Sequence, residues 1–306
     1  MNLLLAIVVF VLAAAASLAV GLLLKWVDRL VTARVQWRVG PPWYQPLADV
    51  VKLMGKENLL PATARQTGFL LAPVAAVAAT AVAAAVLWYG VLNPSGAFIG
   101  DLIVVLYLLA IPAAMTILGA SASGNPHAAV GATREIKLLL SYELPLFLAV
   151  LVAVSKAGWS FRLGSFAAHG PALYSLSGVI AMLVAVVCMQ AKLGLVPFDV
   201  AEAECEIMSG TYVEYSGPSL GMFLMSRAMM LAVLPALLVL VFWGGLGGPA
   251  WLSVPSFVLK YVLLVALTTL IRNTNPRLRI DQVMKLFWYA LTPAAAVALA
   301  LALHGW

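Results

Sequence analysis

The sequence predicts an all-α integral membrane protein, built as a bundle of about eight transmembrane helices. Hydrophobic residues make up 64% of the chain and charged residues only 10%, and the mean hydropathy is +1.03. These values lie far outside the range of soluble globular proteins. The long runs of Ala, Val and Leu lack the alternation of polar and apolar residues that marks a membrane barrel. We therefore expect one polytopic helical domain over residues 1–306.

Each predicted span is an apolar run long enough to cross the hydrocarbon layer, which takes about 18 or more residues as a helix. The first run has no basic segment before it and continues without a charge, so we expect a retained helix and not a cleaved signal peptide. The eight runs are approximately 2–24, 68–92, 102–121, 136–155, 172–192, 219–246, 252–271 and 285–304.

The basic residues predict the orientation. Most of them fall in or beside four segments, about 25–67, 122–135, 193–218 and 272–284, whereas the opposite segments carry only Lys156 and Arg162. The positive-inside rule makes these four segments cytoplasmic and places both termini on the outer side of the inner (cytoplasmic) membrane. The net charge of +6 then reflects topology, and no nucleic-acid partner is expected.

The first cytoplasmic segment has two open interpretations. It contains several prolines and aromatic residues, with a short helix predicted over residues 47–54. It is either a positive-inside anchor with an aromatic belt at the lipid interface, or a platform for a cytoplasmic partner. The candidate docking residues are Arg34, Arg38, Trp43, Asp49, Lys52 and Glu57.

Glu143 is the acid that the sequence places deepest in the membrane. It lies seven residues past Ile136, about 10 Å into the fourth span at 1.5 Å per residue. A charged carboxylate at that depth is costly, so we expect Glu143 to face the bundle interior, either protonated or paired. A purely structural pair with a neighbouring helix is the alternative.

The stretch from Lys192 to Pro218 concentrates acids between the fifth and sixth spans. If a helix began after Pro197, it would stack Asp199, Glu202 and Glu206 on one face, where like charges destabilise it. The cluster must then hold protons, meet cations from another segment or face a partner protein. The five acids are Asp199, Glu202, Glu204, Glu206 and Glu214.

Cations for this cluster are available elsewhere in the chain. Arg227 lies about eight residues into the sixth span, where it either extends to the interface or forms an internal ion pair. The last cytoplasmic segment is a further source, or a simple positive-inside anchor. The candidate charge partners are Arg134, Arg227, Arg279, Asp281 and Lys285.

No catalytic or metal centre is expected in this chain. The two cysteines, Cys188 and Cys205, are 17 residues apart and cannot by themselves ligate zinc or an iron–sulfur cluster. Phosphate-binding loops and nucleophile elbows are missing from the sequence as well. Redox chemistry, if the protein takes part in any, belongs to a partner.

Four motifs in order resemble the membrane subunit shared by respiratory complex I and the energy-converting nickel-iron hydrogenases. They are RVQWRVGPPWYQPLADVVKLMGKE, REIKLLLSYELPL, PFDVAEAECEIMSGTYVEYSGP and RNTNPRLRIDQVMKLFW, and they cover the chain from Arg34 to Trp288. The resemblance implies an eight-helix bundle that joins an electron-transfer arm to an ion-pumping arm. It also implies a proton-accessible route through the acidic stretch and Glu143, with Arg134, Arg279, Asp281 and Lys285 as charge partners.

The motif GPPWYQP is shorter than its usual complex I counterpart and, like the length of 306 residues, is similar to the hydrogenase branch. That branch implies ferredoxin as electron donor, with the nickel-iron centre and iron–sulfur clusters in partner subunits. The implied partners are hydrogenase-like large and small subunits and an iron–sulfur subunit on the cytoplasmic face, antiporter-like subunits laterally, and lipid.

Several alternatives stay open at this point. Two alternatives belong to the same family: the quinone-binding subunit of a complex I-type enzyme, and the equivalent subunit of a sulfur-reducing relative. A stand-alone secondary transporter is a different class, but it would show paired inverted repeats, and the halves of this sequence show no convincing repeat. In a pure scaffold, the acids would only bind partner loops.

Overall fold

The computed structural model describes residues 3–93, 100–246 and 250–305, and within these ranges its regular secondary structure is helical, without strands. Seven helices are long and apolar enough to cross a membrane. The remaining predicted span, 172–192, corresponds to a shorter apolar helix of 17 residues, Leu176–Lys192. The predicted fold class is confirmed.

The elements follow one another along the chain with short connections. They are α1 (Leu3–Val35), α2 (Gln45–Met54), α3 (Gln66–Leu92), α4 (Asp101–Leu108), α5 (Ile111–Ala122), α6 (Pro126–Lys156), α7 (Leu163–Ala168), η1 (Ala172–Tyr174), α8 (Leu176–Lys192), α9 (Glu204–Ile207), η2 (Gly210–Tyr212), α10 (Gly217–Trp243), α11 (Ala250–Thr274), α12 (Ile280–Lys285), the π-helical turn η3 (Leu286–Leu291) and α13 (Thr292–Leu303).

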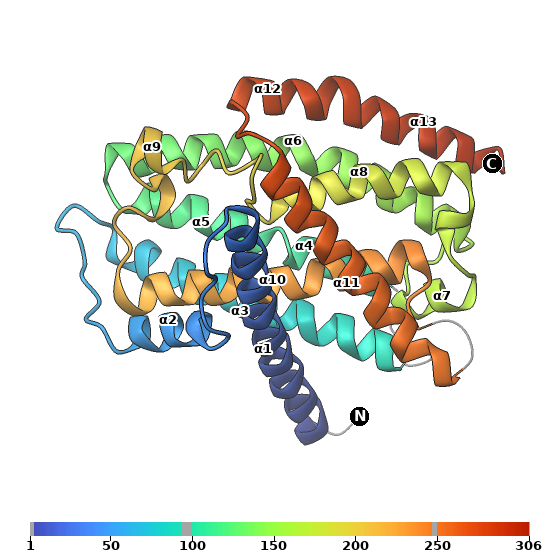
Figure 1. Ribbon diagram of the computed structural model, residues 1–306, viewed down its shortest axis with the longest axis horizontal. Helices are drawn as coiled ribbons and strands as arrows, with labels where there is room; N and C mark the ends of the chain where they lie inside the picture. Colours follow the sequence, from blue (N-terminus) through green and yellow to red (C-terminus); the bar gives the residue numbers. More distant parts are fainter. Residues whose placement is uncertain (1–2, 94–99, 247–249, 306) are drawn as a thin grey trace.

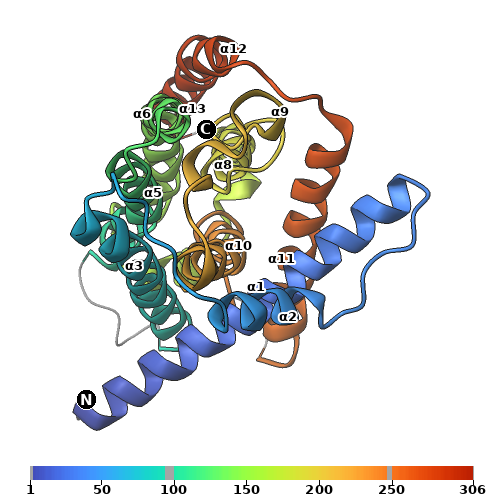
Figure 2. The same ribbon diagram turned by 90° about the vertical axis from the view of Figure 1, so that its left-hand side faces the viewer.

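Helix α10 forms the centre of the bundle. Its most apolar 18 residues are 83% buried, more than in any other span of the described chain. It packs against α3 and α1, and α1 crosses it obliquely (Figures 1 and 2). The crossing is close because Gly21 has no side chain: a Cβ at this position would lie 1.9 Å from the carbonyl oxygen of Ala228. Small residues allow such close approach between membrane helices.

Two helices extend beyond the predicted spans into the predicted cytoplasmic segments. The first predicted cytoplasmic segment begins inside α1, which runs on to Val35 and so carries Lys25 and Arg29 on a helix. The predicted loop 122–135 is mostly the start of α6, which begins at Pro126. The Asn125 side chain accepts a hydrogen bond from the backbone N–H of His127, and this cap lets polar residues start the helix before its apolar part.

The predicted span 102–121 is interrupted within the membrane. Helix α4 ends at Leu108 and α5 begins at Ile111, directly before Pro112. Proline lacks the N–H that a continuous helix needs, which explains the break at this position.

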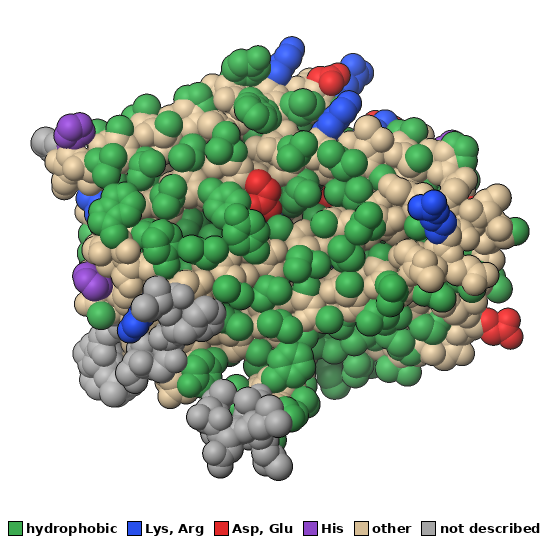
Figure 3. All heavy atoms as spheres, turned by 180° about the vertical axis from the view of Figure 1, so that it is seen from behind, with side chains coloured by type: hydrophobic (Ala, Val, Ile, Leu, Met, Phe, Trp, Pro, Cys, Tyr) green, Lys and Arg blue, Asp and Glu red, His purple; other side chains and the backbone are tan. Residues whose placement is uncertain are grey.

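The outer surface matches a lipid environment. On the face seen in Figure 3, hydrophobic side chains cover the broad middle of the bundle, whereas most Lys and Arg side chains lie toward its margins. Helices α2 and α9 lie at one end of the bundle and the C-terminus at the other (Figure 1). The orientation of the termini relative to the membrane stays a prediction.

Candidate functional site

The acidic stretch does not form the predicted helix. Residues 197–203 are irregular, and only Glu204–Ile207 is helical. The chain then folds back on itself at Gly210, where a Cβ would lie 2.1 Å from the carbonyl oxygen of Ala201 and φ is +46°. Asp199, Glu202 and Glu206 therefore do not share one helical face, because the chain is irregular up to residue 203 and then reverses.

Each of these three acids meets an arginine from a different segment. Asp199 pairs with Arg277 at 2.8 Å. Glu206 pairs with Arg134 of α6 at 2.6 Å. Glu202 accepts two hydrogen bonds from the guanidinium of Arg227, which reaches it from α10. The sequence left open whether these acids hold protons, meet cations from other segments or face a partner protein. The structure shows that they meet cations from other segments.

The other candidates of this group lie apart from these pairs. Glu214 accepts a hydrogen bond from the amide of Asn125, and the side chain of Glu204 falls outside the described part of the chain. Within the described residues, three predicted charge partners, Arg279, Asp281 and Lys285, form no ion pair with an acid or base. Arg277, which was not proposed from the sequence, binds Asp199 instead.

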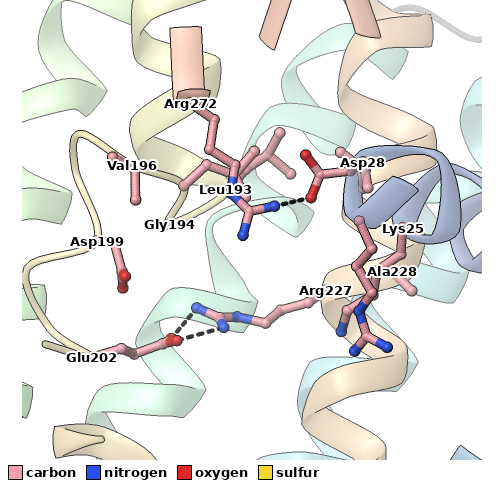
Figure 4. Close-up of a pocket in the computed structure, with 13 residues that line it drawn as sticks. Lys25, Asp28, Leu193, Gly194, Val196, Asp199, Glu202, Arg227, Ala228 and Arg272 are labelled. Carbon is pink, nitrogen blue, oxygen red and sulfur yellow. Dashed lines mark hydrogen bonds and ion pairs between the residues drawn. The ribbon is translucent and has the colours of Figure 1, made fainter. Parts of the chain in front are cut away.

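A charged cavity of about 260 Å³ lies where α1, α10 and α11 meet the segment after α8. In Figure 4, Arg227 points across it to Glu202, and Arg272 of α11 points to Asp28 of α1. Lys25 also lines this cavity and has no ion-pair partner among the described residues. Seven of the 13 lining residues are charged: Lys25, Asp28, Arg29, Asp199, Glu202, Arg227 and Arg272.

A second, smaller cavity continues from the first toward the bundle interior. It has a volume of about 30 Å³, and Glu202 and Arg227 line both cavities. Its other polar lining includes Glu135, Lys192 and Tyr212. The ring of Tyr212 faces the Arg227 guanidinium at 5.2 Å, so the cation is held between an aromatic face and Glu202.

Glu143 forms an ion pair inside the bundle. Its carboxylate accepts a hydrogen bond of 2.7 Å from Nζ of Lys192, the last residue of α8. The Lys192 side chain is 1% exposed and that of Glu143 is 19% exposed. The pairing that the sequence allowed is therefore present. Sequence reasoning missed the partner, because nothing in the spacing of 49 residues indicates that α6 and α8 bring the two side chains together.

Asp199, in the segment between α8 and α9, has an altered proton affinity. Burial raises its pKa from 3.8 to about 6, the charge of Glu202 adds to this, and Arg277 acts against it. A carboxyl group with this pKa exchanges its proton close to neutral pH. Its neighbour Glu202 is held by Arg227. The two acids therefore form a coupled pair at the edge of the charged cavity.

The candidate docking residues lie on and around α2. Asp49 pairs with Arg29 of α1 at 2.8 Å; burial would raise the pKa of Asp49, but hydrogen bonds from Arg29 and Gln45 lower it overall. This pair holds α2 against α1. The remaining docking candidates are exposed: Arg34, Arg38, Trp43, Lys52 and Glu57.

Metal binding has no visible basis in the described residues, where no three His, Cys, Asp or Glu side chains are grouped to hold an ion. The arrangement instead suits proton storage and transfer. It is a line of charged groups that begins at the cavity beside α1 and ends at Glu143 inside the bundle.

Comparisons with known proteins agree with the helical architecture. The chain matches the family model described as NADH dehydrogenase over residues 6–303. The second of the NADH-quinone oxidoreductase H subunits of Syntrophobacter fumaroxidans is 34% identical over 302 residues, covering 92% of this chain and 90% of its own. The NADH-quinone oxidoreductase H subunit of Thermomicrobium roseum is 34% identical over 304 residues, with coverage of 91% and 89%.

A solved structure is similar along nearly the whole chain. It belongs to a membrane-bound sulfane sulfur reductase, an archaeal respiratory membrane complex, with a TM-score of 0.86, 29% identity and coverage of 97% of this chain and 99% of that one. These likenesses, together with the apolar helices, make the chain a multi-pass membrane subunit of the complex I type. The chain belongs to the NADH dehydrogenase subunit 1 family, which includes the H subunits of bacterial NADH-quinone oxidoreductases.

Proposed function

We propose that this chain is the membrane-anchoring and coupling subunit of a ferredoxin-linked, hydrogenase-type complex in the cytoplasmic membrane. In this role it links electron transfer in a cytoplasmic arm to translocation of H⁺ or Na⁺. The observation that carries the proposal is the line of charged groups from the cavity beside α1 through Glu202, Arg227 and Lys192 to Glu143.

The chemistry of coupling follows from this line. Carboxyl groups that interact strongly titrate together, so a change of charge in a docked redox arm shifts protons among them. Asp199, with its pKa near 6, and Glu202 sit where such a change would be felt. Glu143 retains 19% exposure while its partner Lys192 is buried, which supports proton release from Glu143 toward a neighbouring subunit.

The small volume and charged lining of this cavity favour the hydrogenase branch, which uses no membrane quinone. Sites for drug-sized and cofactor-sized ligands are typically about 300–1,000 Å³ and predominantly apolar. The cavity in this chain has about 260 Å³, and more than half of its lining residues are charged. A quinone ring with an isoprenoid chain would have to be desolvated against these charges.

Two other types of complex in the same family are second candidates. Relatives named as NADH-quinone oxidoreductase subunits support a quinone-linked enzyme. The similar solved structure is part of a sulfane sulfur reductase, which supports a sulfur-reducing complex. All three share the coupling role and differ in the electron acceptor.

Isolation of the native complex through a tag on this chain tests the proposal. We expect hydrogenase-like large and small subunits, an iron–sulfur subunit and antiporter-like subunits to co-purify, and the large subunit to hold four metal-binding cysteines. Reduced ferredoxin should then yield hydrogen. Formation of sulfide from sulfane sulfur, or of quinol from a quinone, would replace the hydrogenase branch with the corresponding relative.

Two experiments separate the coupling role from other classes. Ion transport by the purified chain alone, in vesicles without partner subunits, would make it a secondary transporter and contradict the proposal. For a pure scaffold, Glu202→Gln and Glu206→Gln would weaken assembly but leave the ions moved per electron unchanged in whatever complex forms. A lower ratio in assembled Glu202→Gln complexes supports coupling.

A further inference from the structure

We propose that Lys192 carries the proton between the cavities and Glu143, and is more than the counter-ion that keeps Glu143 ionised. The inference rests on the proposed coupling function and assigns one step of it to a single side chain.

The surroundings of Lys192 stabilise its charge only in part. The ammonium group has three N–H donors. In the described structure it has one acceptor, Glu143 at 2.7 Å, and one aromatic face, the ring of Tyr142 at 5.4 Å. The side chain is 1% exposed, so bulk solvent does not reach it. A buried ion pair with few further hydrogen bonds lies close in free energy to its neutral form, amine beside carboxylic acid.

The position of Lys192 makes it the link between two compartments. Its side chain lines the smaller cavity together with Glu135, Glu202 and Arg227. Glu143 lines neither this cavity nor the larger one. A proton that reaches Glu143 from the cavities therefore meets the amine of Lys192 first.

A second cation, Arg227, lines the same small cavity as Lys192. Gly194, two residues after Lys192, has φ of +61°, and a Cβ there would lie 2.9 Å from a guanidinium nitrogen of Arg227. The glycine therefore admits the Arg227 guanidinium to the same cavity wall that Lys192 lines.

The proton passes from group to group in a sequence that balances. The Lys192 ammonium gives a proton to the Glu143 carboxylate, which leaves a neutral amine beside a carboxylic acid. The amine then takes a proton from the carboxyl group of Glu135 across the smaller cavity, and Glu135 regains one from the larger cavity through Glu202. Glu143 releases its proton on its exposed side, so one proton has moved and each group is restored.

Substitution of Lys192 by arginine separates a carrier from a counter-ion. Arginine keeps the positive charge and the pair with Glu143, but its pKa lies about three units above that of lysine, so release of a proton falls by about a thousandfold. We expect K192R complexes in inverted membrane vesicles to oxidise reduced ferredoxin while the ions moved per electron fall at least about tenfold. K192M complexes should also move fewer ions per electron, because methionine cannot carry a proton.

Lys260 offers a matched control on another span. It is a partly buried lysine whose Nζ donates to the carbonyl oxygen of Trp243 at 3.0 Å, with no acid beside it among the described residues. K260R should keep the wild-type ratio. A wild-type ratio in K192R would show that a fixed charge suffices at position 192 and would overturn the proposal.

An infrared measurement decides the same question without ion transport. Reduction of the purified native complex with dithionite should produce a protonated-carboxyl band that is absent in E143Q. We expect this band to persist in K260R and to vanish in K192R. Its persistence in K192R, or its absence from the wild type, contradicts the carrier role, whereas failure of the proposed function appears separately as wild-type complexes that do not couple ferredoxin oxidation to ion uptake.

Discussion

Replacement of Glu143 by glutamine is expected to destabilise the protein because it leaves a buried ammonium group without its counter-charge. Lys192 is 1% exposed, and Glu143 is its only described hydrogen-bond acceptor. Removal of one partner from a buried pair costs about 3–5 kcal/mol. For a chain of this size, that lowers the midpoint of thermal unfolding by on the order of 5 °C.

The double variant E143Q/K192M tests whether the buried charge is the cause. Methionine fills a similar volume without a charge, so the double variant should recover most of the stability lost in E143Q. The measurement is the thermal midpoint of the purified complex for the wild type, both single variants and the double variant. If E143Q alone is as stable as the wild type, or if K192M brings no recovery, the charge of Lys192 is compensated in another way and the reasoning fails.

Three further predictions concern the charged cavity. Gly194→Ala should lower the free energy of unfolding by about 1–2 kcal/mol, because φ is positive and the new methyl group displaces Arg227; thermal midpoints measure this. Asp28→Asn breaks the ion pair that ties α1 to α11 and should cost about 1–2 kcal/mol, also seen in the midpoint. Asp199→Asn should flatten the pH dependence of stability: burial raises the folded pKa from 3.8 to about 6, so the wild type loses about 3 kcal/mol as pH rises through that window.

Each of these has a result that would count against it. A wild-type midpoint in Gly194→Ala would mean that the backbone at this position tolerates a side chain. No change in Asp28→Asn would mean that the pair with Arg272 contributes nothing net, as many exposed pairs do. An unaltered pH profile in Asp199→Asn would show that other groups set the profile between about pH 4 and 7.

Much of the fold was predictable because a helix that crosses a membrane needs a long apolar run, which can be read directly from the sequence. Apolar length located seven spans directly and the eighth as a shorter apolar helix, and the short helix around α2 was expected from its sequence. Capping and proline effects shifted some ends, as at Pro126 and Pro112. These shifts depend on local hydrogen bonds that hydropathy does not contain.

The site was predictable by residue type and less so by partner. The burial of Glu143, as a protonated or paired acid, followed from its depth in the span. That the acidic stretch must hold protons, meet cations or face a partner followed from the repulsion between its like charges. Arg134 and Arg227 were among the candidate cations, but Lys192 and Arg277 were not, because they reach their acids over 49 and 78 residues of sequence. Charge repulsion also argued against the predicted helix after Pro197, and the structure resolves it by a reversal at Gly210.

The most direct test of the account measures ion translocation and electron transfer at the same time in the assembled E143Q complex. The ratio of ions to electrons does not depend on how much complex survives the substitution. We predict that electrons still flow from reduced ferredoxin while the ratio collapses. A wild-type ratio in E143Q would contradict the claim that protons pass from the charged cavity to Glu143.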